Sequence, residues 1–168
     1  MMQRNAAYWI DKLRLARHVE GGYFRETYRS QEVHPGTTNL LFPAGRSFAT
    51  NIYFLLEQGQ FSAFHKIKSD ETWHFYAGDT LEIFEIEQDG KLITHRLGND
   101  LDKNEHLQVV IRAGNWFGSR VAGGGAYTLA GCTVAPGFSF EDFELASAAA
   151  LTNSYPMHEL LIQQLTYS

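Results

Sequence analysis

The feature that most constrains the fold is a series of short, β-prone stretches separated by turn signals at roughly ten-residue intervals. These stretches are rich in aromatic and β-branched residues and end at glycine or polar residues; they cover residues 20–30, 46–59, 60–67, 71–97, 106–121 and 126–138. Within them, Asp89-Gly90 is a strong hairpin signal. Short strands at this spacing predict an antiparallel sandwich or barrel.

Helical patterns occur at the two ends of the chain. Residues 5–17 predict an amphipathic helix with Asn5 as its N-cap. Near the other end, residues 146–151 predict a short helix or turn. A helix over 156–165 follows, with Pro156 in its first turn.

Composition narrows the class of protein. A chain of 168 residues without internal repeats or linkers predicts one domain, residues 1–168. The net charge of −5 argues against nucleic-acid binding, which depends on Lys and Arg neutralising phosphates. The charged N-terminus and the absence of a long apolar run predict a cytoplasmic protein with no membrane segment.

The single cysteine, Cys132, lies in the apolar run 126–134. A lone thiol forms no disulfide within the chain, and in an apolar strand it is usually a small buried hydrophobe. The pattern predicts a structural role rather than a nucleophile.

The chemistry-bearing residues gather in two predicted strands joined by a turn. His65 shares a strand face with Ile67, while Glu71 shares one with Trp73 and leaves His74 on the opposite face. A histidine and a carboxylate on adjacent strands of a barrel, aimed inward, can transfer protons or form part of a metal site.

The spacing Gly59-x5-His65-x-Ile67-x3-Glu71-x6-Gly78 resembles the first cupin motif, in which a second histidine stands at the place of Ile67. The segment "IRAGNWFGSRV" resembles the second motif, with Phe117 in place of its histidine.

Two of the four ligand positions are therefore apolar, and the remaining pair would bind a metal weakly. We expect no metal and no other cofactor. Should a metal be present, the candidate ligands are His65, Glu71 and His74.

Several further segments, "HVEGGYFRETYRS", "SDETWHFYAGD", "WFGSRV", "VAPGFSFEDFEL" and "YPMHELLIQQL", resemble the uncharacterised Cupin_5-type family of predicted sugar epimerases. The resemblance implies an all-β fold: a cupin double-stranded β-helix, or jelly-roll barrel, with short flanking N- and C-terminal helices. It also implies a homodimer. The family's description derives from similarity to deoxysugar epimerases, which are metal-free cupins with a His base and a Tyr acid.

The resemblance implies roles for individual residues. His65 would be the base and Glu71 would orient it, while Arg25 or Arg29 would be available for a phosphate or carboxylate. The remaining candidates for contact with the ligand are Phe24, Glu26, Tyr28, Trp73, Tyr76, Trp116 and Phe117. Tyr28 and Tyr76 are also candidates for the acid. Each aromatic residue could equally fill the core.

The end of the barrel has its own pattern. In residues 136–143, Phe138, Phe140 and Phe143 are expected to pack onto the barrel end, whereas Glu141 and Asp142 are expected to be solvated.

Three functions stay open. The first is a cofactor-free epimerase or isomerase that acts on a sugar or nucleotide-sugar in the barrel cavity. The second is a non-catalytic cupin that binds a small molecule. The third, a metal-dependent dioxygenase or lyase, is disfavoured by Ile67 and Phe117, and the sequence does not decide whether the protein is an enzyme.

Overall fold

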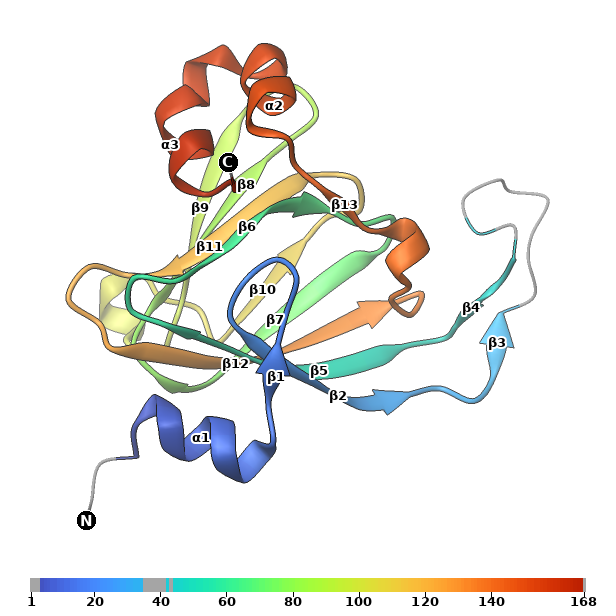
Figure 1. Cartoon of the computed structure of the whole chain (residues 1–168), viewed down its shortest axis with the longest axis vertical. Helices are drawn as coiled ribbons and strands as arrows, with labels where there is room; N and C mark the ends of the chain where they lie inside the picture. The colour runs from blue at the N-terminus through green and yellow to red at the C-terminus, as the bar shows by residue number, and fades with distance from the viewer. Residues whose placement is uncertain (1–3, 35–41, 43, 168) are drawn as a thin grey trace.

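The computed structural model describes residues 4–34, 42 and 44–167, and two facing antiparallel sheets dominate it (Figure 1). The six-stranded sheet runs in the order β1 (Ala16–Arg17), β2 (Tyr23–Arg29), β5 (Thr50–Glu57), β12 (Tyr127–Ala135), β7 (Asp70–Gly78) and β10 (Gln108–Ile111). The five-stranded sheet runs in the order β13 (Glu144–Leu145), β6 (Phe61–Lys66), β11 (Trp116–Val121), β8 (Leu81–Ile86) and β9 (Leu92–Leu97). A small ribbon joins β3 (Val33–His34) to β4 (Arg46–Ser47).

The chain changes sheets at almost every connection from β5 onward. Strands β5, β7, β10 and β12 enter one sheet, and β6, β8, β11 and β13 enter the other. The exception is the β8–β9 hairpin, which turns at Asp89-Gly90 as the sequence predicts. This alternation produces the predicted jelly-roll barrel and places consecutive strands across the barrel from one another.

The alternation corrects one expectation. Strands β6 and β7 were predicted to lie side by side, but they belong to different sheets. Side-chain periodicity fixes the face of each residue along a strand, whereas the partner of that strand is set by long-range pairing. His65 and Glu71 therefore come from opposite walls of the barrel.

Short helices cover the outside of the barrel (Figure 1). Helix α1 (Ala6–Leu13) starts at the predicted N-cap, where the Asn5 side chain accepts a hydrogen bond from the Tyr8 amide. It is shorter than the predicted 5–17, because Arg14 adopts a left-handed conformation that ends the helix before β1.

At the other end, α2 (Ala148–Ser154) and α3 (Glu159–Gln164) pack on the five-stranded sheet. Three 3₁₀ turns complete the fold: η1 (Leu101–Lys103), η2 (Phe140–Asp142) and η3 (Pro156–His158). Over the residues that the structure describes, no helix is long and apolar enough to cross a membrane.

The main core fills the space between the sheets and is built around Phe54, Trp73 and Phe117, each about 1% exposed. Burying aromatic side chains of this size contributes strongly to the stability of the barrel. A cavity lies against this core.

Candidate functional site

The cavity lies against the main core, whose members Ile67, Cys132 and Val134 help to line it, and has a volume of about 390 Å³. This volume lies within the range typical of sites for small molecules. Both sheets and three connecting segments line it, with the residues His18, Glu20, Phe24, Glu26, Arg29, Thr50, Ile52, His65, Ile67, Glu71, Cys132, Val134, Phe138, Ser139, Phe140 and Glu141.

His65 on β6 is almost fully buried in the cavity wall. Its Nδ1 atom lies 2.7 Å from the carbonyl oxygen of Ala63, so this nitrogen carries a proton and donates it. The other ring nitrogen, Nε2, lies 3.3 Å from Oε2 of Glu20. Burial lowers the pKa of His65, and the neutral ring therefore presents an unprotonated Nε2.

Glu20 reaches the centre of the cavity wall from the loop between β1 and β2. Its Oε1 atom accepts a hydrogen bond of 3.0 Å from the Ser62 hydroxyl, and its backbone oxygen accepts one of 2.7 Å from the Ala63 amide. The next residue, Gly21, has φ of 115°, and a Cβ atom there would overlap the Phe61 carbonyl oxygen. Glycine at this position therefore lets the loop approach β6 closely enough to bring Glu20 beside His65.

A second histidine joins this carboxyl group. His18 Nδ1 lies 3.4 Å from Oε2 of Glu20 and 3.3 Å from the Glu20 amide, which donates to it. Its ring packs edge-on against Phe24 at a centroid distance of 4.4 Å. Burial raises the pKa of Glu20 and lowers the pKa of His18, so all three groups of the His18–Glu20–His65 cluster are biased toward their neutral forms.

Glu71 faces the same cavity from β7, in the opposite sheet. Its carboxyl group accepts a hydrogen bond from the Cys132 thiol. Burial, which His65 partly opposes and the Glu20 carboxyl reinforces, raises the pKa of Glu71 to about 7. Burial also raises the pKa of Cys132, so its sulfur is a thiol rather than a nucleophilic thiolate, in agreement with the sequence-based interpretation.

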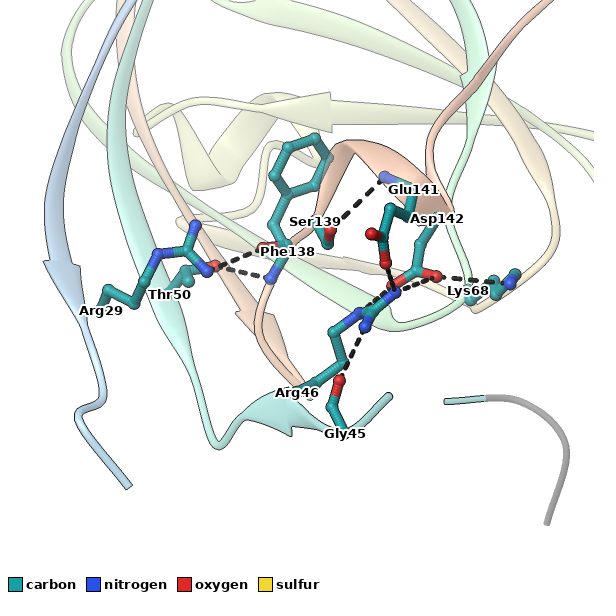
Figure 2. A network of polar contacts seen from close by, with 9 residues as sticks. All are labelled: Arg29, Gly45, Arg46, Thr50, Lys68, Phe138, Ser139, Glu141 and Asp142. Atoms are coloured by element: carbon teal, nitrogen blue, oxygen red, sulfur yellow. Dashed lines mark hydrogen bonds and ion pairs between the residues drawn. The ribbon is translucent and has the colours of Figure 1, made fainter. Parts of the chain in front are cut away.

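Residues 138–141 line the cavity, and because Phe140 is 59% exposed we call this segment the mouth. Figure 2 shows the polar contacts around it. Arg46 on β4 holds this segment with two contacts to Asp142, of 2.5 and 2.9 Å, and one of 2.9 Å to Glu141. The expectation that Asp142 is solvated is wrong, because its side chain is 5% exposed and also contacts Lys68 at 3.3 Å. Phe138 and Phe143 pack on the main core as predicted, whereas Phe140 is exposed and contacts the other two rings.

A bulge in β2 decides which residues of that strand face the cavity. The register with β5 shifts between Glu26 and Tyr28, so Phe24, Glu26 and Arg29 line the cavity while Tyr28 is 51% exposed. Arg25 lies on the other face, with its guanidinium over the Tyr53 ring.

Five of the residues named from the sequence line the cavity: His65, Glu71, Phe24, Glu26 and Arg29, the alternative to Arg25. The other candidates lie elsewhere. Trp73 is buried in the core beside Phe54, and Tyr76 is half exposed on the outside of the six-stranded sheet. Trp116 packs with the helical layer and under the Lys66 ammonium group.

Phe117 does not line the cavity but touches the residue at its centre. It pairs with His65 across β6 and β11, and the two rings lie 4.1 Å apart. Phe117 therefore supports one side of the imidazole by packing.

Sequence analysis missed His18 and Glu20. Both His18 and Glu20 lie in a loop without strand periodicity, and the one available signal was the pair Gly21-Gly22 directly after Glu20. Two glycines with positive φ indicate close approach of the backbone to another element.

The residues present do not fit the metal site of the cupin motif. Among residues 4–34, 42 and 44–167, no group of three or more His, Cys, Asp or Glu side chains is arranged to hold a metal ion. Ile67 and Phe117 place hydrocarbon where the motif has imidazoles. His74 is bound outside the cavity, with Nε2 at 3.1 Å from Thr133 Oγ1 and Nδ1 at 3.0 Å from Gln108.

The jelly roll and its cavity define a protein of the cupin class. Residues 7–146 match the Cupin_5 family, described as Cupin superfamily (DUF985), and the chain belongs to this family. Among solved structures, a protein of Shewanella oneidensis is 41% identical over 98% of this chain and 99% of its own, with a TM-score of 0.87. A hypothetical protein from Leishmania major is 34% identical over 98% of this chain and 100% of its own, with a TM-score of 0.91.

More distant similarity extends to oxalate decarboxylase from Bacillus subtilis. The identity is 15% over 89% of this chain and 36% of the enzyme, with a TM-score of 0.56, and this similarity concerns the fold alone. No curated protein matches the chain.

Proposed function

We propose that this protein is a cofactor-independent isomerase that moves a proton at a carbon next to a carbonyl group, in a sugar or sugar-like molecule. The observation that carries the proposal is the placement of His65 and Glu71 on opposite sheets around one cavity. An epimerase inverts a carbon centre by removing a proton from one face and returning a proton to the other. Proton-exchanging groups on two opposite walls supply that arrangement.

His65 is the base in this proposal. Its Nδ1 proton is held by the Ala63 carbonyl, so Nε2 is the atom that accepts the proton from the substrate carbon. The imidazolium that forms lies beside Glu20, whose Oε2 is 3.3 Å from Nε2, and the ionised form of this carboxyl group stabilises it. Glu20 thus takes the supporting role that the sequence had assigned to Glu71.

Glu71 is the acid. A carboxyl group with a pKa of about 7 is present in both its protonated and ionised forms at neutral pH, and this balance is what proton transfer in both directions requires. Within the described part of the chain no tyrosine lines the cavity, so Glu71 takes the place of the tyrosine acid of related epimerases.

The proposal is tested by incubating the protein with candidate aldoses and ketoses in D₂O and following deuterium uptake at carbon by NMR. We expect uptake with the wild type and loss of at least about 100-fold in rate for His65→Asn and Glu71→Gln, the size of a typical general acid–base contribution. Glu87→Gln, in an exposed pair with Lys91 outside the cavity, is the matched control and should keep the wild-type rate.

Urea unfolding of each variant separates lost chemistry from lost folding. Binding of a sugar without any deuterium uptake by the folded wild type would reject the isomerase and favour the non-catalytic binding protein.

A further inference from the structure

The charged side chains of the cavity are mostly carboxylates. Glu20, Glu26, Glu71 and Glu141 line it, against a single cation, Arg29, among the lining residues that the structure describes. The residues outside the described ranges, 1–3, 35–41, 43 and 168, include no Lys or Arg. No undescribed side chain can therefore add a cation to the cavity.

Arg29 is already engaged. Its Nε and Nη2 atoms form a two-pronged pair with the carboxylate of Glu26, at 3.0 and 2.6 Å, and its Nη1 donates 3.0 Å to the Phe138 carbonyl. Figure 2 shows Arg29 directed at this carbonyl. A guanidinium bound in this way has its charge balanced and its fork geometry occupied.

Two further cations, which contact Glu141 or Asp142, are engaged as well. Arg46 is bound by Asp142 and Glu141, and Lys68 lies 3.3 Å from Asp142. The two cavity histidines are biased toward their neutral forms, because burial lowers the pKa of each. A phosphate or carboxylate group in this cavity would thus lose its hydration without meeting an uncompensated positive charge.

The lining of the cavity is suited to binding the hydroxyl groups of a ligand. Burial raises the pKa of both Glu20 and Glu71 and so favours the protonated carboxyl group, which can donate as well as accept a hydrogen bond. The rings of Phe24, Phe138 and Phe140 line the cavity beside them and offer apolar faces to C–H groups. A cationic ligand fits less well, because Glu26 already neutralises Arg29 and Glu20 already pairs with Ser62 and His65.

We infer that the ligand of this cavity is an uncharged, hydroxyl-rich molecule such as a free sugar, and not a sugar phosphate or nucleotide-sugar. The inference rests on the proposed function for the choice of a sugar, and it narrows the substrate class. It also assigns the exclusion of anions to the Glu26–Arg29 pair. Glu26 neutralises Arg29, which is the single cation among the described lining residues.

Ligand-observed saturation-transfer NMR tests the inference without requiring turnover. The probes are D-glucose, D-fructose and D-xylose at millimolar concentration, together with glucose 6-phosphate, UDP-glucose and glucosamine. We expect wild-type binding of at least one neutral sugar and of none of the charged probes. Binding of a phosphate-bearing probe in the cavity, preferential binding of glucosamine, or no binding of any neutral sugar overturns the inference.

We expect the variant Glu26→Gln to gain affinity for phosphorylated sugars, a change that would not occur if the Glu26–Arg29 pair were merely structural. It frees the Arg29 guanidinium, and we expect affinity for glucose 6-phosphate to rise by about tenfold or more. Glu87→Gln makes the same change in net charge outside the cavity and should leave phosphate binding unchanged. Equal behaviour of the two variants rejects the role of the Glu26–Arg29 pair.

Failure of this inference and failure of the isomerase proposal give different results. A neutral sugar that binds without deuterium exchange rejects the isomerase and keeps the substrate class. A phosphorylated sugar that binds and exchanges deuterium keeps the isomerase and rejects the substrate class.

Discussion

His65 and Glu20 meet inside the barrel wall with Nε2 and Oε2 only 3.3 Å apart, although Glu20 comes from a loop and His65 from a strand. Both side chains are buried, and Nδ1 of His65 is committed to the Ala63 carbonyl. The unprotonated ring nitrogen of His65 therefore lies directly beside a buried carboxyl oxygen. The loop between β1 and β2 thus places a carboxyl group beside the proposed base of the cavity.

Glu71 makes the stability of the protein depend on pH. Its pKa rises from 4.5 to about 7 on folding, so the folded state binds this proton more tightly than the unfolded chain does. The stabilisation is fully present below pH 4.5 and is lost as the pH rises to about 7. A shift of this size corresponds to roughly 3 kcal/mol.

We therefore expect Glu71→Gln to be more stable relative to the wild type at pH 8 than at pH 5, by an amount approaching that value. Urea unfolding of both proteins at the two pH values measures the difference. Parallel pH profiles of the two proteins would show that Glu71 titrates normally.

Ser62→Ala tests the support of Glu20. The Ser62 hydroxyl donates to Oε1 of Glu20 inside the protein, and this bond favours the ionised carboxylate. We expect a loss of about 1–2 kcal/mol in the free energy of unfolding, greater at pH 8 than at pH 5. Ser30→Ala removes an exposed hydroxyl that donates to the Glu32 carbonyl, and is the control that should change stability little. An equal loss at both pH values would contradict the coupling to the charge of Glu20.

Much of the fold follows from local patterns. The strand spacing, the Asp89-Gly90 hairpin and the Asn5 cap each depend on a few neighbouring residues, and each is observed. Pairing across the barrel does not follow from them. Alternation along 61–66 and 70–78 predicts inward faces for His65 and Glu71, but not that their strands enter different sheets.

The site is less predictable than the fold, for two physical reasons. Because of a single extra residue in β2, Arg29 rather than Tyr28 faces the cavity. The composition of the strand does not predict such a bulge. Glu20 and His18 reach the cavity through tertiary contacts of a loop. Only the glycines after Glu20 indicate that loop's close approach to β6.

Gly21→Ala should displace that loop. A Cβ atom would collide with the Phe61 carbonyl oxygen, at a residue whose φ of 115° already disfavours any side chain. We expect a loss of about 3 kcal/mol or more in the free energy of unfolding. Gly59→Ala is the matched control, because Gly59 also has a positive φ but faces open space; it should lose about 1 kcal/mol. Equal losses for the two variants would show that close packing at Gly21 is unimportant.

Arg46 provides the last test, because it ties the mouth of the cavity to β4 (Figure 2). Arg46→Met leaves the buried Asp142 carboxylate with Lys68 as its one remaining cation among the described contacts. Removing one charge of a buried ion pair costs more stability than removing both charges. We expect Arg46→Met to lose roughly 3 kcal/mol in the free energy of unfolding, measured with urea.

The double variant Arg46→Met/Asp142→Leu should recover most of that stability, because no uncompensated charge is then buried. Lys91→Met breaks the exposed pair with Glu87 and should change stability by less than about 0.5 kcal/mol. If Arg46→Met behaved like Lys91→Met, the Arg46–Asp142 pair would not hold residues 138–141 at the cavity. The mouth would then depend on the packing of the three phenylalanines, Phe138, Phe140 and Phe143, alone.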